Sequence, residues 1–441
     1  MSRILGIELR RSAALGAALM LLTIGVVAMF FLDEGASFMS SWMQLAMTQR
    51  LYLAVLWPLA LAAGAWQAGR ERRSKVAELF GSTPRPVPQR TVPTLGAMAV
   101  AVVAAYLGML IAGGVPIFGT AEYLPAAVFA VIAVGALALV AAVWLGLAVG
   151  RLLPWPVTAP ALAVAGLALL LFIPFLTRPR GWLALVFSPI YEMNMPDSYA
   201  TVLPRVSVSQ AVWFAALAIA AVLLFGSEGR RGRLAALLPV VVGAALAITV
   251  MPHSNRLVNQ SLDPVARELV CTEDLPRVCV SRVNSGMLAE VTAPAREGLA
   301  VLAKLPGAPA EVHEDTTTYF PENYPEWRTD VVLLDVEAGP DGHLPKKTSV
   351  LEGVVAGAFA SPPLCDDSAG PADRLAAAYW LIGREPVPGG TFADEFNAEA
   401  VALWHTLQKL PAGEVQSRVA ALRSAAQNCS VKPGPFLDSA R

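Results

Sequence analysis

The chain has 441 residues, of which 55% are hydrophobic and only 15% are charged, and its formal net charge is −1. A soluble domain usually has about 25% charged residues, so this composition indicates that lipid solvates much of the protein surface. The chain has no large basic patch, so a nucleic acid is not an expected partner.

Seven uncharged apolar stretches occupy the first part of the chain. A hydrocarbon layer about 30 Å thick requires about 20 apolar residues in a crossing helix, so each stretch predicts one membrane span. None contains Asp, Glu, Lys, Arg or His, and the sequence therefore predicts no proton relay or ion site inside the membrane. The predicted spans are 12–32, 51–68, 92–113, 125–149, 157–176, 209–226 and 234–251.

The connections between these spans differ in length and character. Residues 33–50 are predicted to form a loop outside the membrane. The long segment 177–208 is expected to contain a helix near Trp182 that is either interfacial or packed on the bundle. Gly146 and Gly150 lie four residues apart, a spacing typical of closely packed helices, although it also arises by chance in Ala/Gly-rich segments.

The arginines and lysines of the loops predict the orientation of the chain. Loops on the cytoplasmic side of a membrane carry more Lys and Arg than loops on the other side. With the N-terminus in the cytoplasm, thirteen basic residues lie inside and four lie outside. The inside set is Arg3, Arg10, Arg11, Arg70, Arg72, Arg73, Lys75, Arg85, Arg90, Arg151, Arg230, Arg231 and Arg233, and the outside set is Arg50, Arg178, Arg180 and Arg205.

Seven spans then place the C-terminal region outside the cytoplasm. The expected fold is an α-helical polytopic membrane bundle in residues 1–251, followed by an α+β extracytoplasmic domain in residues 252–441. The excess of Arg over Lys and the abundance of Ala, Val, Leu and Gly are typical of a high-GC bacterial genome. The expected location is therefore a bacterial cell membrane, which the chain crosses several times.

All four cysteines fall in the predicted extracytoplasmic domain: Cys271, Cys279, Cys365 and Cys429. An even number of cysteines in an oxidising compartment indicates disulfides. Of the three possible pairings we favour Cys271–Cys279 with Cys365–Cys429, because cysteines close in sequence meet most easily. A metal site is the alternative, but C-x-x-C is absent and the four histidines are scattered, so neither a metal nor a cofactor is expected.

The C-terminal domain shows no catalytic motif. Strands are predicted at 277–281, 310–313 and 329–336. Helices are predicted at 285–305, 348–359, 371–383, 393–409 and 412–428. His313 and Glu314 begin like the zinc-binding H-E-x-x-H, but Thr317 replaces the second histidine. Glu314 and Asp315 read as solvated residues, and we do not expect an enzyme.

The basic loop 69–91 is the longest cytoplasmic loop. Val76, Leu79 and Phe80 form an apolar stripe among charged residues, which indicates an amphipathic helix that Gly81 can end. Such a helix can dock on a cytoplasmic partner, or it can act only as a basic anchor at the membrane surface. The residues alone leave both interpretations open.

This loop also carries a resemblance to a family. The string RERRSKVAELFGSTPRP at Arg70–Pro86 resembles the segment after the second span in ABC-2-type transporter permeases of the actinobacterial type. The resemblance implies that the loop contacts a separate ATPase subunit. The implied contact residues are Glu71, Arg72, Arg73, Lys75, Glu78, Leu79 and Phe80.

The family pattern departs from this chain in one respect, because such permeases usually have six spans rather than seven. The chain contains no G-x-x-x-x-G-K-[ST] motif, so any ATP hydrolysis must occur in a partner.

The resemblance also implies a homodimer, or a heterodimer with another permease. A membrane-anchored extracytoplasmic sensor or binding protein without transport activity is the alternative, and an unrecognised membrane enzyme is a third hypothesis.

Overall fold

The computed structural model of the chain describes residues 13–31, 41–70, 87–190, 198–227, 229–255, 261–319, 322–339, 343–344, 347–365, 369–384 and 394–430. It divides into two compact units. The bundle unit comprises Met1–Ile117 and Leu124–Leu262. The C-terminal unit comprises Phe118–Tyr123 and Asp263–Arg441.

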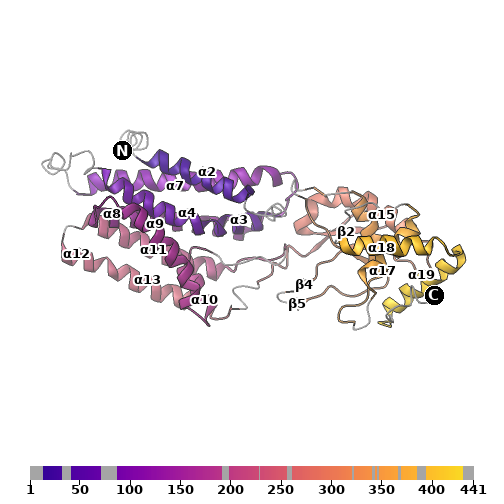
Figure 1. Cartoon of the computed structure of the whole chain (residues 1–441). Coiled ribbons are helices and arrows are strands. Elements are labelled where there is room, and N and C mark those ends of the chain that lie inside the picture. Colours follow the sequence, from indigo (N-terminus) through magenta and orange to yellow (C-terminus); the bar gives the residue numbers. More distant parts are fainter. Residues whose placement is uncertain are drawn as a thin grey trace. The chain divides into compact units, whose positions relative to one another are not determined.

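The bundle unit consists of apolar helices that run along one another (Figure 1). Among its described residues, six helices are long and apolar enough to cross a membrane, and a bent pair can form a seventh span. The helices are α2 (Ala14–Phe31), α3 (Trp42–Leu51), α4 (Leu53–Ala68), α7 (Val87–Ile117), α8 (Ala126–Leu152), α9 (Thr158–Leu176), α10 (Gly181–Phe187), α11 (Pro204–Gly226), α12 (Arg230–Ala235) and α13 (Leu237–Val250). The predicted polytopic α-helical bundle is confirmed.

Helix α8 is the most buried of the span-length helices, and it packs against α4 and α11. Three glycines allow the backbones of α4 and α8 to approach closely. A Cβ on Gly146 would overlap the Leu61 carbonyl, and a Cβ on Gly64 would overlap the Val143 carbonyl. A Cβ on Gly150 would lie 2.7 Å from the Cα of Ala65. The Gly146/Gly150 spacing therefore marks a real helix contact.

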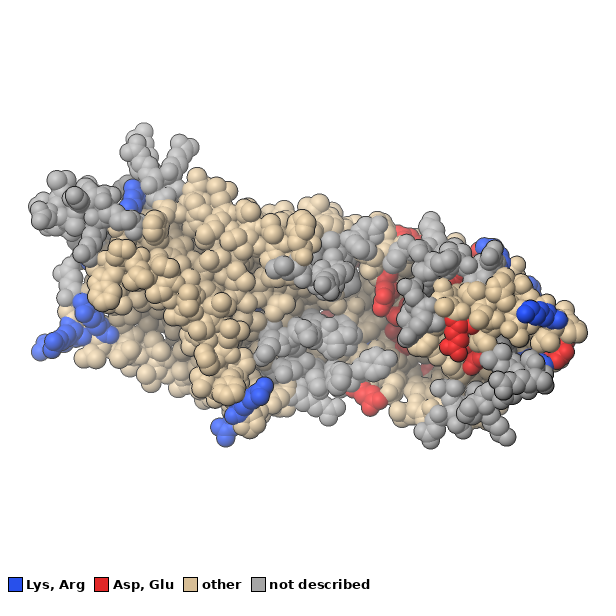
Figure 2. All heavy atoms as spheres, in the orientation of Figure 1, with Lys and Arg blue, Asp and Glu red and all other residues tan. Residues whose placement is uncertain are grey.

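The outer surface of the bundle is apolar. In α9 and in the α12–α13 region, only 17% of the residues of the apolar membrane-spanning segment are buried. These helices therefore expose most of their side chains. On the face seen in Figure 2, uncharged residues cover the length of the bundle, and basic side chains lie near its ends. This distribution is compatible with a multi-pass membrane protein, because hydrocarbon solvates apolar side chains and the interfaces solvate charge.

The second span differs from its prediction. Its helix begins at Trp42 rather than at residue 51, and α3 meets α4 at a 51° bend. The Ser41 hydroxyl accepts a hydrogen bond from the Gln44 amide and caps the new start. Arg50, predicted to lie in an external loop, is therefore in the last turn of a helix inside the bundle, and the loop assignment of residues 41–50 is wrong.

The C-terminal unit has a four-stranded mixed sheet in the order β1-β2-β3-β6. β1 (Leu269–Cys271) is antiparallel to β2 (Val278–Ser281), whereas β2, β3 (Glu311–Glu314) and β6 (Val331–Leu334) are parallel. A small hairpin joins β4 (Thr318–Tyr319) and β5 (Glu322–Asn323). The three predicted strands correspond to β2, β3 and β6, and the α+β class is confirmed.

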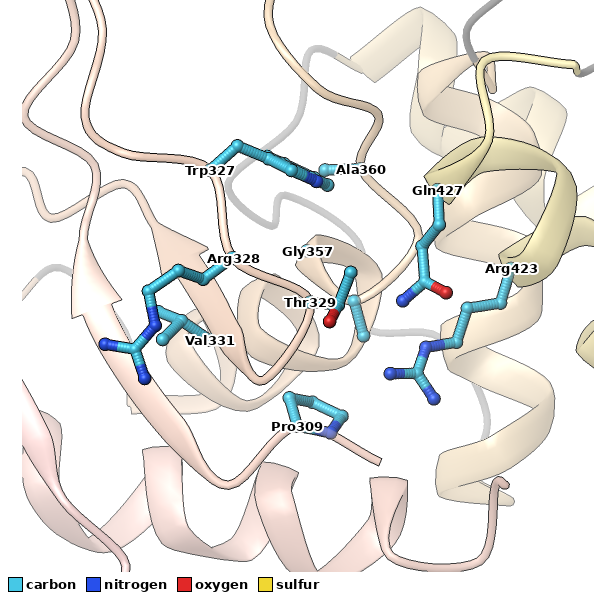
Figure 3. A pocket seen from close by; sticks show the side chains of 10 residues that line it. Pro309, Trp327, Arg328, Thr329, Val331, Gly357, Ala360, Arg423 and Gln427 are labelled. Carbon is cyan, nitrogen blue, oxygen red and sulfur yellow. The ribbon is translucent and has the colours of Figure 1, made fainter. Parts of the chain in front are cut away.

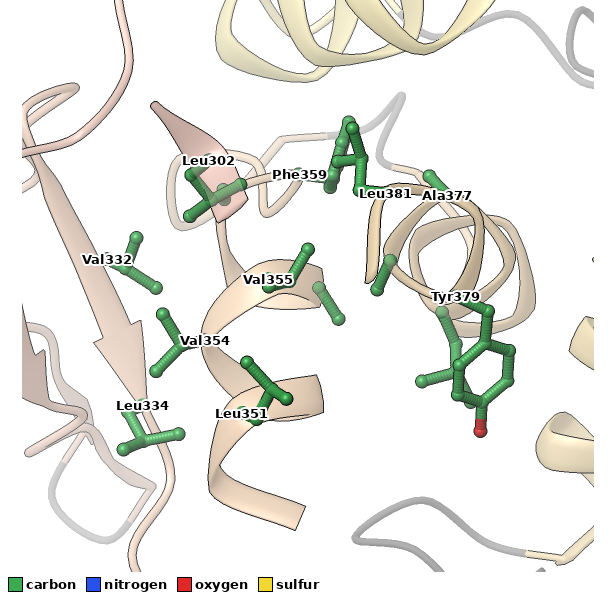
Figure 4. Close-up of a cluster of buried hydrophobic side chains, with 14 of the residues drawn as sticks. Leu302, Val332, Leu334, Leu351, Val354, Val355, Phe359, Ala377, Tyr379 and Leu381 are labelled. Carbon is green, nitrogen blue, oxygen red and sulfur yellow. The ribbon is translucent and has the colours of Figure 1, made fainter. Parts of the chain in front are cut away.

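Five helices share one hydrophobic core with this sheet. They are α15 (Leu288–Leu302), α16 (Lys347–Gly357), α17 (Pro371–Ile382), α18 (Asp394–Leu407) and α19 (Ala412–Gln427). Of these, α15 and α16 pack directly on the strands of the sheet. Figure 4 shows Val332 and Leu334 of β6 facing Val354 of α16, and Tyr379 of α17 belongs to the same buried cluster. The five helices match the predicted ones within a few residues.

Two disulfides close parts of the C-terminal unit, with the pairing expected from the sequence. Cys271 and Cys279 are paired neighbours on β1 and β2, with their Cα atoms 4.0 Å apart. Cys365 and Cys429 link the segment after α16 to the end of α19, with a Cα–Cα distance of 5.5 Å. The described residues contain no group of three or more His, Cys, Asp or Glu placed to hold a metal.

Candidate functional site

Arg50 is the centre of a polar cluster inside the bundle. Its side chain is 1% exposed. The Nε and Nη2 groups donate to the Pro189 carbonyl at 3.1 and 2.9 Å, and Nη1 donates to the Val131 carbonyl at 3.3 Å. Nη2 also donates to Oε1 of Gln210 at 3.0 Å. One guanidinium thus ties α3 to α8, α11 and the segment after α10.

Gln210 extends this cluster. Its side chain is 1% exposed, and its Nε2 donates to the Leu185 carbonyl of α10 at 2.8 Å. The amide is oriented by both contacts, since its oxygen faces the Arg50 guanidinium and its nitrogen faces a carbonyl. The neighbouring Ser209 hydroxyl donates to the Ala247 carbonyl at 2.7 Å and joins α11 to α13.

Tyr106 and Gln49 form the other side of the cluster. Nε2 of Gln49 donates to the Tyr106 carbonyl of α7 at 2.5 Å. A Cβ on Gly135 of α8 would overlap the Tyr106 hydroxyl and would lie 2.9 Å from Cδ of Arg50. The Tyr106 hydroxyl and Oε1 of Gln49 have no hydrogen-bond partner among the residues that the structure describes.

A charged side chain within a membrane bundle is energetically costly, by about 3 kcal/mol or more at the bilayer centre. Charges kept at such positions usually face the bundle interior and serve ion or substrate pathways or conformational switching. Arg50 lies three residues before the start of α4, at the bend between α3 and α4. Broken spans with polar groups at the break are a common construction of substrate sites in transporters.

The sequence pattern places Arg50 outside the bundle for an identifiable reason. A hydropathy window ends a span at a charged residue, so it assigned Arg50 to a loop. The missed signal was the helical continuation upstream, where Ser41 precedes the apolar residues Trp42, Met43 and Leu45 as an N-cap. The seven predicted stretches contain no ionisable residue, but α3 extends the second span upstream and brings Arg50 into the bundle.

The C-terminal unit contains a second buried polar cluster, at the carboxyl ends of β2 and β3. Glu314 is 2% exposed, so its interpretation as a solvated residue is also wrong. Its carboxylate accepts from the Ser281 amide at 2.7 Å, the Ser281 hydroxyl at 2.8 Å and Nδ2 of Asn284 at 2.7 Å. Asn284 lies on the 3-10 helix η2 (Arg282–Met287), which Glu314 thereby fixes to the sheet.

A small hollow lies where α19 meets the segment before β6. Arg423 and Gln427 project into it from α19, opposite Thr329 and Pro309 (Figure 3). Arg423 is 4% exposed, and it donates to the Pro306 carbonyl at 3.0 Å and the Gly307 carbonyl at 2.7 Å. Burial lowers the pKa of Arg423. These contacts satisfy carbonyls beyond the C-terminal end of α15, which is a structural task.

The predicted partner-binding residues of the basic loop lie outside the described residues, which stop at Arg70 and resume at Val87. This applies to Glu71, Arg72, Arg73, Lys75, Glu78, Leu79 and Phe80. The structure describes the two helices that this loop joins, α4 and α7.

No family model, curated protein or solved structure matches this chain.

Proposed function

We propose that the chain is the membrane-spanning permease subunit of an ABC-type exporter, powered by a separate ATPase subunit that docks on loop 69–91. The C-terminal unit then lies on the extracytoplasmic side of a bacterial cell membrane. Its two disulfides support this side, because disulfides persist in oxidising compartments.

The buried arginine at a broken span is the observation that carries this proposal. An anchor for an external domain requires apolar helices only and has no need of a charged side chain inside the bundle. In a transport subunit the same group has a use, since a bend held by hydrogen bonds to several helices can have two discrete arrangements. The contacts of Arg50 with Val131 and Gln210 involve α8 and α11, two helices of the bundle interior.

The basic loop supplies the second support. It joins α4, which carries the bend, to α7, which carries Tyr106. A partner bound to Arg72 and Arg73 would act directly on both helices. In the proposed cycle, ATP binding favours one arrangement of the bundle and ATP hydrolysis restores the other, because each state of the ATPase has a different affinity for them.

The test is purification of the tagged full-length chain from its own membranes in mild detergent. We expect a nucleotide-binding subunit to co-purify and to hydrolyse ATP. The variant Arg72→Glu/Arg73→Glu reverses two charges in loop 69–91, and we expect it to lose this subunit and its ATP hydrolysis.

The control is Arg230→Glu/Arg231→Glu, which reverses two adjacent exposed arginines at the start of α12. This variant should keep the ATPase subunit. If no nucleotide-binding subunit co-purifies with the unaltered chain, or if both variants lose it equally, the proposal is wrong.

A membrane-anchored extracytoplasmic binding protein is the second candidate. The observation that favours it is the separate hydrophobic core of the C-terminal unit, which two disulfides reinforce. This candidate predicts that cells from which the chain has been deleted regain their normal behaviour when the chain is supplied again, even if every co-purifying ATPase is absent. The exporter hypothesis predicts that the re-supplied chain has no effect in cells without the ATPase.

A further inference from the structure

A short segment between two bundle helices belongs to the C-terminal unit. Phe118–Tyr123 follows α7 directly and is followed within three residues by α8, yet it groups with Asp263–Arg441 rather than with the bundle. The chain therefore enters and leaves the C-terminal unit at this segment, and it enters again after Leu262. We refer to Phe118–Tyr123 as the docking segment.

Specific contacts hold the docking segment within the C-terminal unit. The Tyr123 hydroxyl donates to Oδ2 of Asp263 at 2.7 Å, and the Ser285 hydroxyl donates to Oε2 of Glu122 at 3.1 Å. Thr120 and Ala121 are 7% and 6% exposed, so the middle of the segment is buried. The two residues before them, Phe118 and Gly119, are exposed. Partial burial and the Asp263 carboxylate raise the pKa of Tyr123.

The closest approach is between two backbones. Gly286 lies against Thr120 so tightly that a Cβ on Gly286 would overlap the Thr120 carbonyl oxygen and lie 2.8 Å from its carbon. A flexible side chain can move away from such a contact, but a backbone carbonyl cannot do so without moving the segment. Gly286 is thus required by the docking of residue 120.

Hydrogen bonds tie the receiving surface to the sheet. Gly286 and Ser285 lie on η2, and the neighbouring Asn284 is bonded to the buried Glu314 carboxylate and, at 3.2 Å, to the Val336 carbonyl. Ser281, at the start of η2, bonds to Glu314 through its amide and its hydroxyl. The docking segment is therefore fixed to the mixed sheet through the 3-10 helix η2.

The two helices that flank the docking segment also form the Arg50 cluster. α7 carries Tyr106, and α8 carries Val131, whose carbonyl accepts from Arg50, and Gly135, which faces Tyr106. α7 runs from Tyr106 to Ile117, with Pro116 removing one ladder hydrogen bond in its last turn, and α8 runs from Ala126 through Val131 and Gly135. α-Helices transmit displacement along their axis because each turn is hydrogen-bonded to the next.

We infer that the docking segment is a mechanical link through which the C-terminal unit sets the position of the α7–α8 helix pair at the Arg50 cluster. A ligand or cargo that shifts η2 shifts the ends of both helices together. For its effect on ATP hydrolysis this inference rests on the proposed exporter function, but the link itself does not depend on that function.

The test compares two glycine-to-alanine substitutions in the full-length chain, reconstituted in lipid nanodiscs. Gly286→Ala creates the overlap with Thr120. Gly119→Ala adds the same methyl group within the docking segment, where nothing lies within 4 Å. Hydrogen–deuterium exchange is measured for the docking segment, the last turn of α7, the first turn of α8, and β3.

We expect Gly286→Ala to accelerate exchange about tenfold in the docking segment and also in the adjoining turns of α7 and α8, while β3 stays protected. Gly119→Ala should match the unaltered chain. If the docking segment keeps its protection in Gly286→Ala, it is not held by η2, and if only the segment accelerates, no coupling reaches the helices. Either result overturns the inference.

Loss of protection in β3 would mean that Gly286→Ala unfolds the unit, and the variant Tyr123→Phe then decides. It removes only the hydrogen bond to Asp263 and should accelerate the same peptides to a smaller extent. A chain without an ATPase partner would refute the exporter and leave these exchange results intact. With the partner present, Gly286→Ala should change ATP hydrolysis without releasing the ATPase subunit.

Discussion

The Nη2 group of Arg50 donates a hydrogen bond to Oε1 of Gln210 at 3.0 Å, across 160 residues of sequence and between two helices of the bundle. Both side chains are 1% exposed. The pair joins the bent second span to α11, and substitutions of Arg50 can measure how much it contributes to the stability of the bundle.

We expect Arg50→Met to lower the stability of the bundle by about 2–4 kcal/mol, because the carbonyls of Pro189 and Val131 would stay buried and lose a charged donor. The stability of Arg50→Lys should lie between that of the unaltered chain and that of Arg50→Met, because an ammonium group has fewer donors than the planar guanidinium with its five. The measurement is the thermal unfolding midpoint of the purified chain in detergent.

The matched control is Arg205→Met, which removes an exposed arginine from α11 of the same unit. It should leave the midpoint nearly unchanged. Equal midpoints for Arg50→Met and Arg205→Met would contradict the structural role of the buried guanidinium.

The α4–α8 contact predicts a strong difference between two glycines. Gly146→Ala places a methyl group into the Leu61 carbonyl and should destabilise the chain by about 1–3 kcal/mol, which is typical of overpacking. Gly226→Ala adds the same group at the end of α11, where nothing lies within 4 Å, and should be neutral. Unfolding midpoints of both variants measured side by side test this, and a neutral Gly146→Ala would exclude close helix packing.

The two disulfides should contribute unequally. A cross-link restricts the unfolded chain more when it closes a longer loop, so the bridge that spans 64 residues should contribute about 4 kcal/mol and the bridge that spans eight about 2–3 kcal/mol. Cys365→Ser/Cys429→Ser should therefore lower the unfolding midpoint of the C-terminal unit more than Cys271→Ser/Cys279→Ser. The opposite order would show that strain or local packing outweighs loop closure.

Glu314→Gln should destabilise the C-terminal unit by about 2–3 kcal/mol. The amide group of glutamine would turn a donor toward the Ser281 and Asn284 donors, or leave one of them without an acceptor. Glu326→Gln, at an exposed position before β6, provides the control and should have little effect. The readout is protection of β2 and β3 amides against exchange, and intact protection in Glu314→Gln would refute the assigned role.

Much of the secondary structure could be predicted from local pattern. The apolar run before Gly226 is long enough to span a bilayer, and the run at Val331–Leu334 is bounded by polar residues as a buried strand should be. The cysteine pairing could also be predicted, since Cys271 and Cys279 are separated by only eight residues. Each of these features depends on residues close together in the chain.

The candidate sites depended on contacts that no local pattern encodes. Arg50 next to a predicted span reads as a loop residue until Pro189, Val131 and Gln210 are seen around it. Glu314 reads as solvated until the donors of Ser281 and Asn284 are seen to enclose it.

By itself, the sequence determined that the front of the chain is a set of apolar helices and that its end is a disulfide-linked α+β unit, because hydrophobic length and periodicity are local properties. Only the tertiary structure decided that Arg50 is inside the bundle and that Thr120 packs on Gly286. The physical reason is that residues distant in the sequence determine whether a charge is buried or two backbones approach closely. The neighbouring residues in the sequence do not predict such contacts.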